Sequence, residues 1–372
     1  MPRALLLCEY PALNGGERSL LAVLPTMQRA GWEFDAWCPG AGPLTAAFAA
    51  LGVRTIAHAP ITDPRTTLAE RRADLSEVLS CAPRYDLVHA NSLATGRVSG
   101  PVVEAMRTPS ITHLRDIVGL NRTTVADLNR HRRLLAVSAA TRAHHVAQGI
   151  AADKSEVLYN GIDRRCFDAA APTQYLHREL GVSSFTKFVA VIGQLILRKG
   201  QDAALTAALA AMERNCDLHV LVVGKRHSEK FETIAFEEKL RDLPQEYADR
   251  VHFLGTRMDV PRLLAECSLL LHMARQEPLG RVLLEAAASG LPIVATDVGG
   301  TREIFPREQK DGAILVGVDD IDAATKAIGR VLRSEELFLD MSSAGRERIA
   351  AAFTVEQSAA GLLRHYAEVS GR

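Results

Sequence analysis

Short apolar runs alternate with longer amphipathic segments along most of this 372-residue chain. Turn-forming residues bound the runs, which suits strands of a parallel sheet that is covered on both faces. Regular strand–helix alternation favours βαβ units and a doubly wound α/β fold. The first series of runs is ALLLC (4–8), FDAWCP (34–39), DLVHAN (86–91), SITHL (110–114) and RLLAVS (133–138). The second is KFVAVIGQ (187–194), DLHVLVVGK (217–225), RVHFLG (250–255), CSLLLHM (267–273) and LPIVATD (291–297).

A looser segment, DAAAPTQYLHRELG (168–181), separates the two series and follows the turn-like sequence NGID (160–163). A chain of this length is expected to form two to three domains. We therefore predict two Rossmann-like α/β domains, residues 1–165 and 166–353. The amphipathic pattern over about 354–372 predicts a C-terminal helix; it fits packing on either domain, and we assign it to the first.

The composition excludes several classes of protein. Lys+Arg and Asp+Glu are equal at 44 each, so the whole chain has no electrostatic bias toward nucleic acid. The six cysteines include no Cys-x-x-Cys pair, which argues against zinc and a dithiol redox site. The apolar run before Glu9 is too short for a signal peptide or a membrane span. We expect a cytoplasmic protein without a metal or cofactor.

The segment RQEPLGRVLLEAAASGLPIVATDVGG (275–300) places two acids in mostly apolar and small surroundings. Pro278 suits a first helical turn, because its missing N–H is not needed there. The predicted helix runs from about Leu279 to Ser289. Glu277 then lies in the loop at the carboxyl end of a strand, where open α/β sheets bind ligands.

This helix start has the chemistry of an anion site. The amides of Leu279, Gly280 and Arg281 point at a ligand, and the helix dipole strengthens their attraction. Glu285, further into the helix, can accept two hydrogen bonds from a vicinal diol such as a ribose. A solvated carboxylate, or a pair with Arg281, explains Glu285 equally well. Glu277 is also explained as an acid favoured by the helix dipole.

A second loop, GQLILRKG (193–200), brings two cations to the end of a strand. Arg198 and Lys199 stand just before a predicted helix that begins near Gln201, where they can neutralise a diphosphate. The loop is neither a Walker A motif nor GxGxxG. The alternative is a solvated basic turn.

The ordered set of motifs closely resembles the retaining GT-B glycosyltransferases of family 4 (glycosyl transferases group 1). The E-x7-E signature is present as Glu277 and Glu285, and the following G-x-P spans 290–292. The resemblance covers nearly the whole chain, and the matching fragments of the amino half are NGGERSL (14–20), HANS (89–92), THLRD (112–116), AVSAATR (136–142) and LYNGID (158–163). It implies a GT-B architecture, with two Rossmann-like domains that face each other across a cleft.

The resemblance also implies roles for individual residues. Glu285 would bind the ribose of a nucleotide-sugar donor, Glu277 the sugar hydroxyls, and Lys199 with Arg198 the departing diphosphate. The amides of Leu279, Gly280 and Arg281 would hold the diphosphate or sugar. Gly15 and Gly16 would form the facing loop, and His113 would lie near the transferred sugar. Many relatives have Gly-Arg where this chain has Gly193-Gln194, which leaves Arg198 as the candidate substitute.

On this basis we expect transfer of a sugar to an acceptor hydroxyl with retention, in cell-envelope polysaccharide, lipopolysaccharide or glycolipid synthesis. Glu285→Gln and Lys199→Ala should abolish transfer and leave the melting temperature nearly unchanged. Two alternatives are a sugar-nucleotide 2-epimerase of the same fold and a non-catalytic nucleotide- or glycan-binding module. The basic stretch RTTVADLNRHRRLL (122–135) fits contact with the inner membrane surface and a lipid-linked acceptor, or a solvated helix face. Asp320 and Asp322 are interpreted as helix capping and not as a metal motif.

Overall fold

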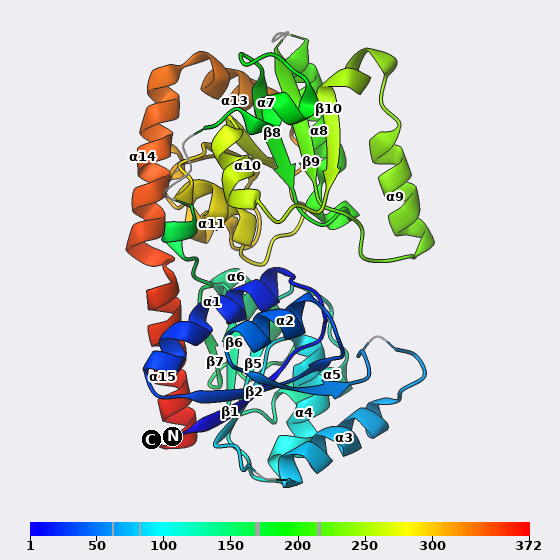
Figure 1. The fold of residues 1–372 in the computed structure, drawn as a ribbon, viewed down its shortest axis with the longest axis vertical. Helices are drawn as coiled ribbons and strands as arrows, with labels where there is room; N and C mark the ends of the chain where they lie inside the picture. The colour runs from blue at the N-terminus through cyan, green and yellow to red at the C-terminus, as the bar shows by residue number, and fades with distance from the viewer. Residues whose placement is uncertain (62, 82, 168–171, 214–216) are drawn as a thin grey trace. The chain divides into compact units, whose positions relative to one another are not determined.

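The structure, a computed structural model, describes residues 1–61, 63–81, 83–167, 172–213 and 217–372. The chain forms two compact units (Figure 1). Unit 1 comprises Met1–Ile162 and Thr354–Arg372, and unit 2 comprises Asp163–Phe353. Unit 1 therefore ends just before the predicted boundary after residue 165, and it includes the C-terminal helix.

Unit 1 contains a seven-stranded sheet in which every strand pairs in parallel with its neighbours. In sheet order the strands are β3 (Arg54–His58), β2 (Glu33–Pro39), β1 (Arg3–Leu7), β4 (Leu87–Ala90), β5 (Ser110–Leu114), β6 (Arg133–Ala136) and β7 (Ser155–Val157). The helices are α1 (Gly15–Arg29), α2 (Pro43–Ala50), α3 (Leu68–Ser80), α4 (Leu93–Ala105), α5 (Arg122–Leu128), α6 (Ala139–Ala147) and α15 (Val355–Ser370). The strand order reverses between β1 and β4.

The residues of β1 alternate between two separate cores, as expected for a sheet buried on both faces. Ala4 and Leu6 pack in a cluster that includes apolar side chains of α1, α2 and α15. Leu5 and Leu7 pack in another cluster, formed with α3 and α4. Figure 1 shows helices on both sides of this sheet. The C-terminal helix thus completes a core of unit 1.

Unit 2 repeats the same topology with six parallel strands. In sheet order they are β10 (Val251–Gly255), β9 (Leu218–Val223), β8 (Lys187–Ile192), β11 (Leu269–His272), β12 (Ile293–Thr296) and β13 (Ala313–Val316). The α-helices are α7 (Tyr175–Leu180), α8 (Gln201–Met212), α9 (Phe231–Arg241), α10 (Val260–Glu266), α11 (Arg281–Ala288), α12 (Thr301–Ile304), α13 (Ile321–Arg333) and α14 (Glu335–Ala352). Short 3-10 helices are η1 (Arg164–Cys166), η2 (Leu197–Lys199), η3 (Gln245–Arg250) and η4 (Glu308–Asp311). Here the order reverses between β8 and β11.

All ten predicted apolar runs contain strands, and the C-terminal helix is confirmed as α15. Three strands, β3, β7 and β13, had no counterpart among the predicted runs. Each is an edge strand, and β3 is largely exposed. An edge strand needs fewer apolar residues than a central one, so its sequence signal is weaker. Asp320 caps α13 by accepting a hydrogen bond from the amide of Ala323 at 2.9 Å, as predicted. Of the predicted inter-domain connection, residues 168–171 lie outside the described residues.

Candidate functional site

Two loops of unit 2 meet at the point where the strand order reverses. Strand β8 leads into η2, which carries Arg198 and Lys199, and β11 leads into the loop that carries Glu277. The two strands are hydrogen-bonded neighbours, so their carboxyl ends lie side by side. In open α/β sheets this is the position where ligands bind.

Glu277 is the centre of a buried polar cluster. Its side chain is 4% exposed, and one carboxylate oxygen, Oε2, contacts Nζ of Lys199. The same oxygen accepts a hydrogen bond of 2.8 Å from Nε2 of His272, the last residue of β11. Burial alone raises the pKa of Glu277, but Lys199 and His272 outweigh burial and hold that pKa below its ordinary value. The structure thus holds a carboxylate in its charged form next to a cation.

Backbone contacts fix the two loops against each other. The amide of Arg275 donates to the carbonyl of Arg198 at 2.9 Å, and the guanidinium of Arg275 forms an ion pair of 2.8 Å with Asp202 of α8. Gly200 has a φ of +63°, and a Cβ there would lie 1.8 Å from the carbonyl oxygen of Met273. Only glycine permits this approach, which brings the residue after Lys199 against the end of β11.

The N-terminus of α11 adds a set of amides beside the cluster. Its N-cap residue, Gly280, has a φ of +99°. A helix N-terminus carries a partial positive charge on its first amides, which makes it a favourable position for an anion. Leu279 is 2% exposed, so its side chain belongs to the core.

Glu285 forms an ion pair with Arg281, whose Nε lies 2.8 Å from Oε1. The side chains are 14% and 18% exposed. This is the i,i+4 pairing that the sequence offered as the alternative to ribose binding. The pair places a carboxylate and a guanidinium together on the first turns of α11.

A third loop reaches the cluster from β12. The amide of Gly300 donates to the carbonyl of Glu277 at 3.0 Å, so the glycine turn after β12 supports the loop that carries Glu277. The carboxyl ends of β8, β11 and β12 therefore share one polar centre in unit 2.

The other predicted residues lie in unit 1. Gly15 and Gly16 begin α1, after β1, and a Cβ on Gly16 would lie 3.0 Å from Cδ of Arg115. Arg115 follows β5 and donates to Asn91, after β4, and to Asn160, after β7, at 2.7 and 2.8 Å. The absence of a side chain at Gly16 thus allows an arginine to join loops at the carboxyl edge of the sheet. His113 and Arg115 line a small cavity of unit 1.

His113 is buried at the end of β5 and belongs to a chain of hydrogen bonds. Its Nδ1 lies 2.9 Å from Nη2 of Arg115 and 3.0 Å from Nε2 of His89. Nδ1 of His89 lies 2.8 Å from the hydroxyl of Tyr366 on α15. Burial, followed by the positive charge of Arg115, lowers the pKa of His113 well below its ordinary value. His113 is therefore a neutral imidazole.

Two family models match the chain, one in each unit. The model described as "Glycosyltransferase Family 4" matches residues 13–165, and "Glycosyl transferases group 1" matches residues 186–334. The chain belongs to glycosyltransferase family 4. The resemblance drawn from the sequence motifs is confirmed.

Known proteins similar to this family 4 chain match it over different lengths. The lipopolysaccharide core biosynthesis mannosyltransferase LpsB of Rhizobium meliloti is 27% identical over 56% of this chain and 60% of that protein. N-acetyl-alpha-D-glucosaminyl L-malate synthase of Bacillus anthracis is 32% identical over 54% of this chain and 50% of that protein. The chain spans about half the length of these curated relatives. The crystal structure of Anabaena Alr3699/HepE in complex with UDP-glucose matches this chain with a TM-score of 0.85 at 22% identity. The match covers 99% of this chain and 100% of the HepE chain. The predicted fold, two Rossmann-like domains of the GT-B class, is confirmed.

In this family 4 chain, the structure brings some of the predicted residues together and adds others. Lys199 and Glu277 are in contact, and Arg198 holds their loops through its carbonyl group. Sequence reasoning missed His272 and left out Arg115. His272 carried the same signal as His113, a polar residue that closes an apolar strand at the ligand-binding edge of the sheet.

The basic stretch 122–135 does not form one helix in this family 4 chain, because α5 ends at Leu128 and β6 begins at Arg133. Arg130 contacts Glu104, Arg132 donates to the carbonyl of Val369, and Arg133 pairs with Glu368. These three cations are engaged within unit 1, and membrane contact through this stretch stays a prediction. Among the described residues, no helix is both long and apolar enough to cross a membrane.

Proposed function

We propose that this chain transfers a sugar from a nucleoside diphosphate sugar to an acceptor hydroxyl. The observation that carries the proposal is the polar centre of unit 2, where the Lys199–Glu277 pair lies beside the N-terminus of α11. Fixed cations and helix-terminal amides suit a diphosphate, and a buried, charged carboxylate suits sugar hydroxyls. Their position at the reversal of strand order suits a nucleotide.

Each residue of the centre has a role in this proposal. Lys199 neutralises the leaving diphosphate, and Arg198 replaces in part the cation that relatives carry at the position of Gln194. The amides of Gly280 and Arg281 bind the phosphates, and Glu277 accepts hydrogen bonds from the sugar. Glu285 exchanges its contact with Arg281 for the ribose hydroxyls, which frees the Arg281 guanidinium to approach the diphosphate. In unit 1, His113 contacts the transferred sugar, and Gly15 with Gly16 lines the binding site.

The transfer proceeds with retention of configuration at the anomeric carbon. The bond from that carbon to the diphosphate oxygen breaks, and the bond to the acceptor oxygen forms on the same face. The acceptor proton passes to the leaving phosphate. Lys199 and the helix amides stabilise the charge that develops on this phosphate in the transition state. These groups supply the positive charge without a metal ion.

The relatives support the class of acceptor. LpsB acts in lipopolysaccharide core biosynthesis, and another relative, from Corynebacterium glutamicum, is a GDP-mannose-dependent mannosyltransferase that acts on a phosphatidylinositol monomannoside. We infer a glycan or lipid-linked acceptor of the cell envelope, modified on the cytoplasmic side.

A donor screen followed by a transfer assay tests the proposal. UDP-, GDP- and ADP-sugars are compared by thermal shift, where a ligand at 100 times its Kd adds about 2.7 kcal/mol of stability. The stabilising donor is then incubated with a panel of lipopolysaccharide-core, glycolipid and polyisoprenyl acceptors, with Glu285→Gln as the matched control. Transfer by the wild type and not by the variant supports the proposal.

The same experiment separates the alternatives. NMR of the donor incubated without acceptor detects a sugar-nucleotide epimer if the chain is a 2-epimerase. Stabilisation by a nucleotide without transfer to any acceptor of the panel points to a binding module. Either result contradicts the proposed function.

A further inference from the structure

The C-terminal helix α15 reaches the predicted sugar-contacting histidine through an unbroken chain of side chains. Tyr366 of α15 is fully buried, and its ring packs edge-on against Trp32 with a centroid separation of 4.7 Å. Its hydroxyl bonds to His89 on β4, and His89 bonds to His113 on β5. A helix that is last in the sequence thus contacts the middle of the unit 1 sheet.

Arg115 determines the direction of every hydrogen bond in this chain. A guanidinium only donates, so Nδ1 of His113 must accept from Arg115 and carries no proton. The second neighbour of Nδ1, Nε2 of His89, must then also donate, which leaves Nδ1 of His89 as an acceptor. The hydroxyl of Tyr366 must donate to that acceptor. With His89 neutral, this is the one proton arrangement that gives each of the three contacts a donor and an acceptor.

The consequence is a defined tautomer at His113. Both hydrogen bonds of the ring within the described part of the chain use Nδ1, so the single proton of the neutral imidazole is on Nε2. Burial lowers the pKa of His89 to about 3, and burial raises the pKa of Tyr366, so each member keeps its neutral form at physiological pH. An Nε2–H group donates a hydrogen bond and cannot act as a base.

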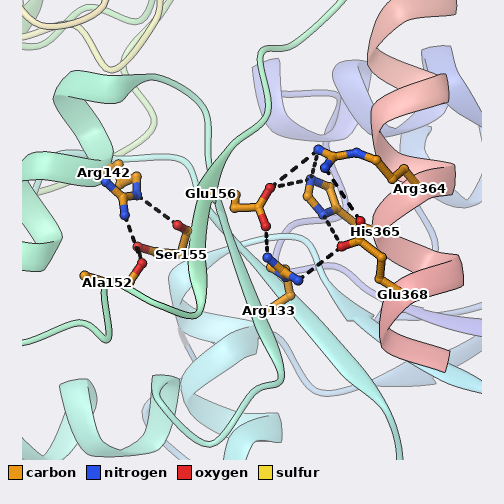
Figure 2. A network of polar contacts seen from close by, with 8 residues as sticks. All are labelled: Arg133, Arg142, Ala152, Ser155, Glu156, Arg364, His365 and Glu368. Carbon is orange, nitrogen blue, oxygen red and sulfur yellow. Dashed lines mark hydrogen bonds and ion pairs between the residues drawn. The ribbon is translucent and has the colours of Figure 1, made fainter. Parts of the chain in front are cut away.

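Ionic contacts hold α15 at this position. Arg133 of β6 pairs with Glu156 of β7 and, at 3.1 Å, with Glu368 of α15 (Figure 2). Arg364 of α15 reaches Glu156 at 3.5 Å. Figure 2 shows the two guanidinium groups next to the carboxylates.

The same acids, with His365, have the spacing of a metal site, because one ligand atom from each lies within 4.8 Å of the others. Two arginines already neutralise the two carboxylates, so a divalent cation would have to displace them. The cluster therefore serves to dock α15 on β6 and β7.

We propose that Tyr366 is a positioning residue for His113. By donating to His89, it keeps Nε2–H of His89 directed at Nδ1 of His113 and so helps Arg115 to hold the ring in place, with Nε2–H of His113 as a hydrogen-bond donor to an oxygen of the transferred sugar. This role rests on the proposed function. Without the hydroxyl, Nδ1 of His89 is a buried acceptor without a donor, which favours rotation of His89 and removes one of the two donors that orient His113.

Two measurements on the full-length protein test the proposal. The first is 15N NMR with labelled histidine, in which the His113 signals are assigned by their loss in His113→Gln. The expected result is an unprotonated Nδ1 and a protonated Nε2 at neutral pH. A proton on Nδ1, or a doubly protonated ring, would overturn the proposal.

The second measurement compares the kinetics of Tyr366→Phe and Glu368→Gln. Phenylalanine keeps the buried ring and removes only the hydroxyl, whereas Glu368→Gln weakens the docking of the same helix and leaves the hydrogen-bond chain intact. Tyr366→Phe should lower kcat about tenfold, the loss expected for one hydrogen bond, with little change in the donor KM. Glu368→Gln should retain the wild-type kcat.

The outcomes also separate this proposal from the proposed function. If the wild type is active and Tyr366→Phe has an unchanged kcat, the positioning role alone is overturned. An equal loss of kcat in Tyr366→Phe and Glu368→Gln would overturn it too. Partial activity in His113→Gln, which retains a donor near the position of Nε2, supports a donor role for His113. A wild type that binds nucleotide sugars and transfers none would overturn the proposed function together with this role.

Discussion

The ammonium group of Lys199 contacts the carboxylate of Glu277, and the two residues come from loops that follow the neighbouring strands β8 and β11. Both side chains are largely buried, at 16% and 4% exposure. In the absence of a ligand each neutralises the other. A diphosphate needs the same cation. The Lys199–Glu277 pair therefore places part of the proposed donor site before a ligand binds.

This pair changes the expectation for Lys199→Ala. Removing one partner of a buried ion pair costs up to about 3–5 kcal/mol, and the hydrogen bond from His272 to Glu277 reduces that cost. We therefore expect loss of transfer together with a lower melting temperature, and not the unchanged melting temperature predicted from the sequence. A double-mutant cycle with Glu277→Gln, measured by urea unfolding, gives the free energy of interaction between the Lys199 and Glu277 side chains. Equal stability of Lys199→Ala and the wild type would contradict the pairing.

Glu285→Gln separates ribose binding from helix pairing. An i,i+4 ion pair contributes about 0.2–0.5 kcal/mol, so the variant should unfold almost as the wild type does. If Glu285 also binds the ribose, calorimetry should show that the Kd for the nucleoside diphosphate rises at least tenfold. Arg330→Gln, which replaces a basic residue on α13, serves as the control for a change of charge in unit 2. An unaltered nucleotide affinity would limit Glu285 to its pair with Arg281.

Gly200→Ala should destabilise unit 2 far more than Gly181→Ala. Both glycines have a positive φ, +63° and +66°, so alanine costs about 1–2 kcal/mol at either position. At Gly200 the new Cβ would also meet the carbonyl oxygen of Met273 at 1.8 Å, whereas nothing lies within 4 Å at Gly181. Thermal unfolding followed by circular dichroism measures the difference. Similar melting temperatures for the two variants would show that β11 and η2 do not approach so closely.

Glu17 should make the stability of unit 1 depend on pH. It is 4% exposed, and burial, opposed by its own amide and by Arg115, raises its pKa from about 4.5 to about 7. Between these values the folded state binds more protons than the unfolded state, so stability falls as the pH rises. At about 1.4 kcal/mol per pKa unit, the free energy of unfolding falls by about 3 kcal/mol across this pH range.

Glu17→Gln should remove this pH dependence and raise stability at pH 8. Both tryptophans, Trp32 and Trp37, lie in unit 1, so their fluorescence during urea unfolding at pH 5 and pH 8 reports on that unit. Glu77→Gln, an exposed change on α3, is the control. If the stability of Glu17→Gln still falls between pH 5 and pH 8, another group causes the pH dependence.

Chelation tests the source of positive charge at the leaving phosphate. If Lys199 and the amides of α11 supply it, transfer should continue at an unchanged rate in excess EDTA. The assay is repeated with added Mg²⁺ or Mn²⁺. A large loss of rate that only a metal ion restores would contradict the metal-independent mechanism.

Sequence periodicity was enough to predict the fold and to place the candidate residues Lys199 and Glu277 at the carboxyl ends of neighbouring strands. Apolar runs of β-strand length, separated by amphipathic helices, permit little else than parallel sheets covered on both faces. The strands that escaped prediction are short edge strands, β3, β7 and β13, which are in contact with one neighbour only. Lys199 and Glu277 were predicted because each follows a central strand, at the edge where parallel sheets bind ligands.

Partners brought together by folding could not be read from the sequence. Lys199 and Glu277 are far apart along the chain, and the pairing of Glu285 with Arg281 was one of several alternatives that the spacing allowed. The chain from Tyr366 through His89 to His113 joins the C-terminal helix to two central strands. Local sequence determines which segments form helices and strands, because backbone hydrogen bonds and apolar periodicity act over short distances. The pairing of buried charges and the tautomer of a histidine depend on which atoms lie within about 3 Å, and only the tertiary structure decides that.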